Sequence, residues 1–247
     1  MKRVALLGGT KGIGRALARL FAERGDWVAL LGRDAGELAK SAADLEARGP
    51  KGLRAPAVPC DLERPEGFRA ALEEAEQKLE GLDAVVVTAG VFSTQDQLEA
   101  DPGLTQKLLA ANFTNTVLFC EEARKKLLQR GGGTLCVFSS VAGDRGRSKV
   151  VLYGAAKAGL SAYLEGLDHR FRGQGLVTVC VKPGFVKTGM TEGQEPPPFA
   201  GEAEEVARVA LRGLDAGRPV VYAPPVWRAV MSAVRALPRF VMRRARF

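Results

Sequence analysis

Short apolar runs alternate along the chain with longer amphipathic stretches. The apolar runs predict strands over residues 4–7, 27–31, 84–88, 134–139, 177–181 and 220–222, with a weaker candidate over 53–60. Between them, apolar residues recur every three or four positions, which predicts helices over residues 14–24, 35–48, 65–79, 104–129, 151–171 and 203–215. This alternation is typical of a parallel sheet with right-handed crossovers. We therefore expect an α/β fold with a single doubly wound, Rossmann-like parallel sheet and helices on both faces.

The last 22 residues differ from the rest of the chain. Residues 226–247 hold six arginines and no acid among large apolar residues, so a formal charge of +8 leaves +2 for residues 1–225. A basic amphipathic segment can lie on an anionic membrane, or its apolar face can dock on the domain or on a second subunit. We treat residues 1–225 as the catalytic domain and 226–247 as a C-terminal segment. Pro238 predicts a helix before it and a short turn after it.

Composition excludes several classes of function. Nucleic acid is not expected as a partner, since the basic residues concentrate in the C-terminal segment and no reader motif is present. The only histidine is His169 and no GxSxG motif occurs, which argues against a Ser/His/Asp triad and against a metal site. No apolar run reaches the roughly 18 residues that a membrane span needs.

The cysteines and the N-terminal run bear on location. Four cysteines lie far apart in apolar runs without CxxC pairing, and glycines interrupt the N-terminal apolar run, which is atypical of a signal peptide. We expect a reduced, cytoplasmic protein, with a peripheral position at the inner face of the membrane as the alternative. The cysteines are Cys60, Cys120, Cys136 and Cys180.

A glycine-rich loop follows the first predicted strand in "ALLGGTKGIGRALARLF". Gly8, Gly12 and Gly14 have the spacing GxxxGxG and open an amphipathic helix. Bare backbone N–H groups and a helix N-terminus can approach a pyrophosphate where no Cβ intervenes. The alternative is that these glycines only make a tight turn between strand and helix.

The end of the second strand indicates which dinucleotide binds. An NAD site usually places a carboxylate there to accept from the ribose 2′-hydroxyl. Here the strand ends at Gly32 and Arg33 follows, so that Arg33 and Lys11 fit a 2′-phosphate. This favours NADP(H) over NAD(H). Asp34 favours NAD(H) instead, because its carboxylate could accept a hydrogen bond from the ribose 2′-hydroxyl.

A Ser, Tyr, Lys constellation suggests the chemistry. Ser140 ends the strand in "VFSSVAG", and Tyr153 and Lys157 occur in "YGAAKAG", on one face of a predicted helix. A nearby ammonium favours the phenolate and is expected to lower the pKa of the tyrosine. Ser140 can hold a carbonyl oxygen while Tyr153 gives it a proton. Alternatively, Tyr153 and Lys157 merely share a surface helix.

Taken in order along residues 3 to about 188, these motifs resemble the short-chain dehydrogenase/reductase family. The shared features are GxxxGxG, Asp61 after the third strand, Ala89-Gly90 after the fourth, Asn112, Ser140, Tyr153 with Lys157, and Pro183-Gly184 through Thr188. One departure is Thr88, which stands where the family usually has an asparagine. We expect this change to weaken a contact that stabilises the sheet.

The resemblance implies roles for individual residues. Asn112 would anchor a proton-relay water that leads to Lys157, and Lys157 would contact the nicotinamide ribose. Asp61 would contact the adenine, while Val186 and Thr188 would hold the nicotinamide carboxamide. The candidate catalytic residues are Asn112, Ser140, Tyr153 and Lys157. The candidate cofactor-binding residues are Gly8, Thr10, Lys11, Gly12, Ile13, Gly14, Arg33, Asp61, Leu62, Ala89, Gly90, Tyr153, Lys157, Pro183, Gly184, Val186 and Thr188.

The resemblance also implies an activity. We expect an NADPH-dependent carbonyl reductase or alcohol dehydrogenase that forms a homodimer or homotetramer; the alternative is a non-catalytic cofactor-binding scaffold or sensor. The stretches "SSVAGDRGRSKVVLYGAAKAGL" and "VKPGFVKTGM" and the C-terminal segment resemble one branch, the bacterial decaprenylphosphoryl-2-keto-ribose reductases. This branch implies a lipid-linked keto-sugar or another amphiphilic ketone. Reductases of unrelated ketones share similar endings, so the substrate, the direction and the oligomeric state stay open.

Overall fold

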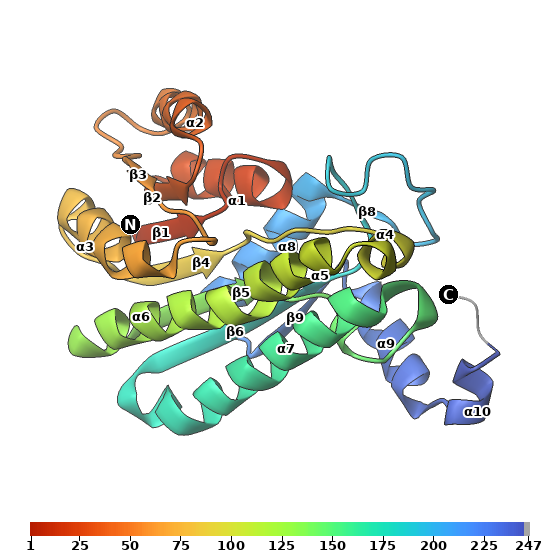
Figure 1. Ribbon diagram of the computed structural model, residues 1–247. Coiled ribbons are helices and arrows are strands. Elements are labelled where there is room, and N and C mark those ends of the chain that lie inside the picture. The colour runs from red at the N-terminus through yellow and green to blue at the C-terminus, as the bar shows by residue number, and fades with distance from the viewer. Residues whose placement is uncertain (245–247) are drawn as a thin grey trace.

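The centre of the molecule is a parallel sheet of seven strands (Figure 1). The computed structural model describes residues 1–244. Its strands run in the spatial order β3-β2-β1-β4-β5-β6-β9, and every adjacent pair is parallel. The strands are β1 (Arg3–Leu7), β2 (Trp27–Gly32), β3 (Ala57–Pro59), β4 (Ala84–Val87), β5 (Gly133–Phe138), β6 (Leu176–Pro183) and β9 (Val220–Ala223). The predicted doubly wound α/β fold is thus confirmed.

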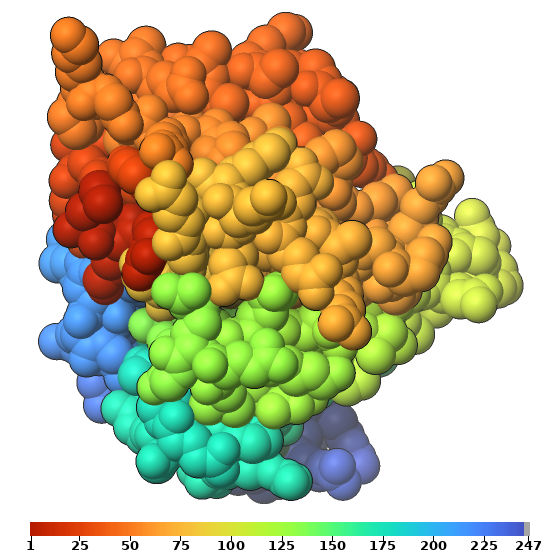
Figure 2. All heavy atoms as spheres, turned by 90° about the vertical axis from the view of Figure 1, so that its left-hand side faces the viewer, coloured from red at the N-terminus to blue at the C-terminus, as the bar shows by residue number. Residues whose placement is uncertain are grey.

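Helices cover both faces of the sheet. The helices α1 (Gly12–Glu23), α2 (Ala35–Arg48) and α8 (Ala203–Asp215) pack on one face, and α3 (Phe68–Leu79), α6 (Asn115–Gln129) and α7 (Val151–Phe171) pack on the other. Alternate side chains of each strand enter the two cores: in β1, Val4 and Leu6 face one, and Ala5 and Leu7 face the other. From the side, α3, α6 and α7 form successive colour bands (Figure 2), as expected when each crossover places its helix beside the previous one.

The predicted single helix over 104–129 is wrong. The chain instead forms α5 (Pro102–Leu109), a π-helical turn (Ala110–Thr114) and then α6. The extra residue in the π turn shifts the helical register but keeps the backbone helical, so the apolar period continues across it. A short helix, α4 (Gln95–Ala100), escaped prediction although Thr94 and Gln97 form a capping box at its start.

Two small features complete the far end of the sheet. The strands β7 (Val186–Lys187) and β8 (Gly201–Glu202) pair and close a loop over residues 188–200. Helices α9 (Val226–Ala236) and α10 (Arg239–Met242) lie on either side of Pro238, as the proline predicts. Arg246 of the C-terminal segment lies outside the described residues. Within residues 1–244, no helix is long and apolar enough to cross a membrane.

Candidate active site

A pocket of about 490 Å³ opens at the carboxyl ends of the central strands. It lies where the strand order reverses between β1 and β4, the place at which doubly wound sheets bind their ligands. Most of the candidate residues line it: Gly8, Lys11, Gly12, Ile13, Gly14, Gly90, Asn112, Ser140, Tyr153, Lys157, Pro183, Gly184, Val186 and Thr188. Five candidates do not line it: Thr10, Arg33, Asp61, Leu62 and Ala89.

The glycines of the first loop serve two different purposes. Gly8 has φ 95°, and a Cβ there would lie 2.6 Å from the backbone nitrogen of Ala89; a Cβ at Gly14 would overlap the carbonyl oxygen of Gly8. These two glycines are therefore required by the packing of the turn itself. Gly12, with φ 50°, is different, because its Cβ would lie 3.3 Å from Thr188 on the other side of the pocket mouth. Close backbone packing thus explains Gly8 and Gly14. At Gly12, a side chain would narrow the entrance of the pocket beside Thr188.

The start of α1 is suited to an anion. No side chain caps this helix, and its N-cap residue is Lys11. By contrast, Asp34 caps α2 by accepting from the N–H of Glu37 at 3.0 Å. An uncapped helix N-terminus beside a glycine loop leaves backbone N–H groups for a phosphate. The residues here therefore fit the pyrophosphate of a dinucleotide.

The residues after β2 and β3 surround a separate, open region. The Arg33 side chain is 66% exposed and makes only a 3.4 Å contact with Glu63. Asp61 accepts from the N–H of Glu63 at 3.0 Å, and Asn115 donates to the carbonyl of Leu62 at 2.6 Å. Among the described residues, the Arg33 guanidinium thus has one long ion pair, with Glu63, and is otherwise exposed to solvent.

The candidate catalytic side chains meet at the centre of the pocket. Ser140 follows β5, while Tyr153 and Lys157 lie on α7. Lys157 is 4% exposed, and its Nζ donates to the carbonyl of Phe138 at 3.0 Å and lies 5.8 Å from the centre of the Tyr153 ring. The Tyr153 ring packs edge-to-face on Phe92, with 5.2 Å between ring centroids.

Burial dominates the acid–base properties of these groups. It raises the pKa of Tyr153 to about 12, although the Ser140 hydroxyl lowers it in part. Burial also lowers the pKa of Lys157 to about 8. The expected lowering of the Tyr153 pKa is therefore not found in the protein without cofactor, because desolvation of the phenolate outweighs the hydrogen bond with Ser140. At neutral pH Tyr153 is a protonated acid.

Asn112 lies in the π-helical turn that interrupts the helix. Its side-chain amide donates to the carbonyl of Val91 at 2.7 Å and accepts from the N–H of Val91 at 3.0 Å. A Cβ at Gly90 would lie 2.7 Å from Asn112 Oδ1 and 3.7 Å from Lys157 Nζ. The π turn thus brings Asn112 next to Lys157, and Asn112 holds the segment after β4 against the pocket.

Comparison with known proteins agrees with this arrangement. Residues 2–197 match the family model for short chain dehydrogenases. An uncharacterised oxidoreductase of Mycobacterium tuberculosis is 35% identical over 241 residues, covering 98% of this chain and 96% of the relative. Carbonyl reductase family member 4 of Xenopus tropicalis is 28% identical over 218 residues, covering 85% and 89%. The crystal structure of a putative short-chain alcohol dehydrogenase from Sinorhizobium meliloti superposes with a TM-score of 0.81 and 25% identity, covering 92% of this chain and 96% of that chain.

The chain belongs to the short-chain dehydrogenase/reductase family. It is therefore an oxidoreductase of a family that uses a nicotinamide cofactor. His169 is exposed on α7, and residues 1–244 contain no group of three or more His, Cys, Asp or Glu side chains that could hold a metal.

Thr88, which stands where the family usually has an asparagine, contacts the end of β1. Its hydroxyl lies 3.2 Å from the carbonyl oxygen of Leu7 and 3.0 Å from that of Gly8, to which it donates. Thr88 thus ties the residue after β4 to the end of β1, and the expected weakening relative to asparagine stays a prediction.

The C-terminal segment forms part of the pocket wall, which sequence reasoning missed. Trp227 of α9 packs over Gly184, and its indole N–H donates to the carbonyl of Phe199 at 3.2 Å. Behind it, Met231 and Val234 are buried against Val141, the residue after Ser140. The apolar face of α9 thus docks on the domain of this short-chain dehydrogenase, one of the roles that the sequence left open.

Arg147 is a second pocket residue that escaped prediction. The sequence "GDRGRSKV" does not show which of its basic residues faces the pocket, because all of them occur in the same polar loop. The neighbouring Arg145 has a structural partner, the carbonyl of Leu237 at 2.8 Å.

Proposed function

We propose that the protein is an NADPH-dependent carbonyl reductase, working in either direction between a ketone and a secondary alcohol. One observation carries the proposal: Ser140, Tyr153 and Lys157 line the same pocket as the glycine loop. The similarity to a carbonyl reductase supports the same class of substrate. Every other feature of the site is consistent with this chemistry.

The side chains divide the work at the carbonyl group. A nicotinamide cofactor, when bound, supplies the hydride. Ser140 donates a hydrogen bond to the carbonyl oxygen, and Tyr153 gives that oxygen its proton. Tyr153 is suited to this role in reduction, because burial raises its pKa and keeps it protonated. Lys157 stabilises the phenolate that remains on Tyr153, and Asn112 anchors the relay water that returns the proton through Lys157.

Other residues of the chain would hold the cofactor. The uncapped start of α1 and the lack of a side chain at Gly12 suit the pyrophosphate. Val186 and Thr188, in the turn after β6, would hold the carboxamide; Thr191 fixes that turn by donating to the carbonyl of Val186 at 2.7 Å. Asp61 would contact the adenine.

The preference for NADPH rests on two cations. Arg33 is exposed and only weakly engaged by Glu63, and Lys11 is also exposed, so that both are available for a 2′-phosphate. Asp34 is occupied in capping α2, which weakens the opposing interpretation that it accepts from the ribose hydroxyl of NAD.

The entrance of the pocket suits an amphiphilic ketone. Met190 lines it and is 46% exposed, and Phe199, 56% exposed, accepts the hydrogen bond from Trp227 at the same entrance. A substrate with an apolar chain, such as a lipid-linked keto-sugar, could cover these side chains. This is the substrate class that we propose.

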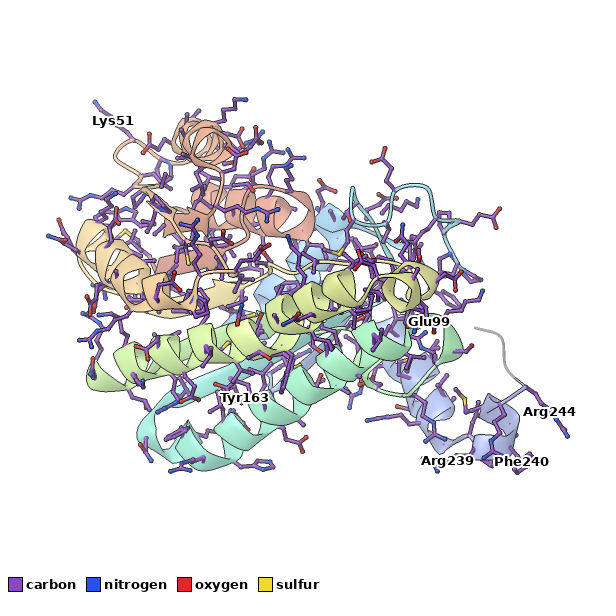
Figure 3. All side chains as sticks on the ribbon, in the orientation of Figure 1. Lys51, Glu99, Tyr163, Arg239, Phe240 and Arg244 are labelled. Carbon is purple, nitrogen blue, oxygen red and sulfur yellow. The ribbon has the colours of Figure 1, made fainter. Side chains whose placement is uncertain are left out.

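A peripheral membrane contact would bring such a substrate to the entrance. Arg239 and Phe240 of α10, and Arg244 just after it, project at the outer corner of the molecule (Figure 3), and Phe240 is 63% exposed. Arginine near anionic headgroups contributes about 1 kcal/mol per residue. Since the apolar face of α9 is docked, we propose contact through the exposed arginines and Phe240.

Sedimentation with anionic vesicles tests this contact. Full-length protein should pellet with phosphatidylserine vesicles at low salt and release as salt rises. Replacing Arg228, Arg235 and Arg244 by glutamine should abolish pelleting. Replacing Lys40, Lys51 and Arg69 removes the same charge from the body and should preserve it. Equal behaviour of the two triple variants would contradict the contact.

The oligomeric state and the cellular location are proposed from the family resemblance. We propose a homodimer or homotetramer in the cytoplasm, where the four unpaired, buried cysteine thiols would stay reduced.

The experiment that tests the proposed function follows NADPH absorbance with a panel of ketones. Wild-type protein should consume NADPH with at least one ketone, and the alcohol should appear in equal amount. If NADP(H) binds but no ketone is reduced and no alcohol is oxidised, the protein is instead the non-catalytic scaffold or sensor.

A further inference from the structure

The pocket contains a cation that the proposed reaction does not use. Arg147 lies in the loop between Ser140 and α7, and it lines both the active-site pocket and a second groove of about 670 Å³. That groove runs between this loop, the start of α7 and α10. Arg147 therefore stands at the boundary between the reacting centre and the outer surface.

Arg147 has no partner of its own among residues 1–244. Its Nε is buried without a hydrogen-bond partner. The nearby acid, Asp144, is already engaged on both oxygens: Oδ1 accepts from Lys182 Nζ at 2.6 Å and Oδ2 from the Tyr222 hydroxyl at 2.8 Å. Asp144 attracts Arg147 only at longer range, and burial lowers the pKa of the guanidinium. The side chain is half-buried, and desolvating a charge in part without a partner is unfavourable, so an anion is the expected partner.

The charged residues that line the two cavities are all basic. Three further arginines line the outer groove, and no Asp or Glu is among the described residues that line either cavity. An anion approaching Arg147 thus meets attraction and no opposing carboxylate. The three arginines are Arg145, Arg239 and Arg243.

Arg147 and Lys11 lie in different parts of the pocket. Lys11 belongs to the glycine loop, where the dinucleotide phosphates would lie, whereas Arg147 follows the strand that carries Ser140. An anion at Arg147 would therefore belong to the ketone.

We infer that Arg147 binds an oxyanion, a phosphate or a carboxylate, carried by the substrate itself. The guanidinium fork pairs with two oxygens of such a group and so fixes its orientation. Holding the anion there would orient the carbonyl toward Ser140 and Tyr153. This inference rests on the proposed function and narrows it to anionic ketones.

Matched pairs of ketones test the inference. The pairs are dihydroxyacetone phosphate with dihydroxyacetone, and levulinate with methyl levulinate, each at saturating NADPH. Wild-type protein should favour the anionic member in kcat/KM. Arg147→Gln should reduce that preference by about 10- to 100-fold, the effect of one charge-assisted hydrogen bond, and Arg147→Lys should retain part of it. Lys149→Gln, an exposed cation of the same loop that lines neither cavity, should leave the preference unchanged.

A binding measurement separates this inference from the proposed function. Phenyl phosphate is titrated by calorimetry into protein saturated with NADP⁺. Wild-type and Lys149→Gln protein should bind it equally, and Arg147→Gln should bind it at least about tenfold more weakly. Binding without turnover of any ketone would contradict the proposed function and leave the anion site intact. Equal binding by wild type and Arg147→Gln, or no binding by wild type, would overturn the anion site.

Stability gives a readout that needs no ligand. If Arg147 is an unpaired, half-buried cation, Arg147→Gln should raise the Tm of the protein without cofactor by a few degrees. A lower Tm would mean that the guanidinium holds the structure together, and would count against an anion site.

Discussion

The two ends of the pocket are built in different ways. At the reacting end, Gly8, Gly90 and Ser140 come shortly after β1, β4 and β5. Tyr153 and Lys157 come from α7, a long helix that packs on the sheet. At the substrate end, Arg147 and Trp227 come from segments that reach the pocket only through packing. The sheet therefore positions the glycine loop and Ser140, while the docking of loops and helices positions Arg147 and Trp227.

The two ends also differ in how their polar groups are satisfied. Lys157 donates to a backbone carbonyl and Asn112 binds both backbone polar groups of Val91, so the reacting end is closed by bonds within the protein. At the substrate end, the Nε of Arg147 has no partner within residues 1–244. The polar side chains of the reacting end are therefore held in place by the protein, whereas Arg147 is available to bind a group of the ligand.

Replacing the proton donor should give the largest effect. Tyr153→Phe removes only the phenolic hydroxyl, so ketone reduction should fall by about 10²- to 10⁴-fold while NADPH still binds. Tyr163→Phe is the matched control: Tyr163 lies on the same helix, between α6 and α7 (Figure 3), and donates to Glu121 at 2.7 Å away from the pocket. Steady-state kinetics and cofactor fluorescence measure the two properties. If the Tyr153→Phe variant keeps more than about a tenth of the wild-type activity, Tyr153 is not the proton donor.

Cofactor choice should give the next largest effect. Charge-assisted hydrogen bonds to a phosphate contribute about 1.5–3 kcal/mol each. Arg33→Ala should therefore lower the ratio of kcat/KM for NADPH to that for NADH by about 10- to 150-fold. Lys51→Ala, an exposed cation distant from the pocket (Figure 3), serves as the control. A wild-type preference for NADH would contradict the assignment.

The buried ammonium should make stability depend on pH. The pKa of Lys157 is lowered to about 8 in the folded protein, whereas an unfolded lysine keeps its proton to about pH 10.4. Between these values the unfolded state binds more protons, so the free energy of unfolding gains about 1 kcal/mol per pH unit from this residue.

Urea unfolding of the protein without cofactor measures this effect. From pH 8.5 to 10, wild type should gain stability relative to Lys157→Met at that rate, and other titrating groups cancel in the difference. A constant difference would show that folding does not lower the pKa of Lys157.

The smallest effect concerns the substrate end. Trp227→Phe removes the hydrogen bond to the carbonyl of Phe199 but keeps an aromatic ring over Gly184. The KM for a bulky ketone should increase by about 2- to 10-fold, the net effect of one neutral hydrogen bond, while kcat stays near the wild-type value. Trp227→Ala should raise KM further. A fall in kcat alone would place Trp227 at the reacting end instead.

That several candidate residues line one pocket could be expected from the sequence, for a physical reason. Strand ends of a parallel sheet meet at one edge, so Gly8, Ser140 and the turn at Pro183 could be placed together from the alternation of strands and helices alone. The π turn at Asn112 could not be predicted, because it leaves the apolar period almost unchanged.

The substrate end escaped prediction because it depends on docking. The apolar residues of the C-terminal segment were visible in the sequence, but nothing in their spacing says that Met231 covers Val141 or that Trp227 reaches Gly184. Likewise, the lack of a partner for Arg147 follows from Lys182 and Tyr222 having engaged Asp144, a contact between β6, β9 and the loop after β5.

Transfer of deuterium is the most direct test of the central claim that this pocket reduces a carbonyl group. NADPH labelled at the nicotinamide C4 on one face or the other is incubated with protein and a ketone that is consumed, and the alcohol is analysed by mass spectrometry. Our account predicts that the label from one face, and only that face, appears on the carbinol carbon with wild type, and that Tyr153→Phe yields almost none. An alcohol without label from either face, or equal product from Tyr153→Phe, would contradict it.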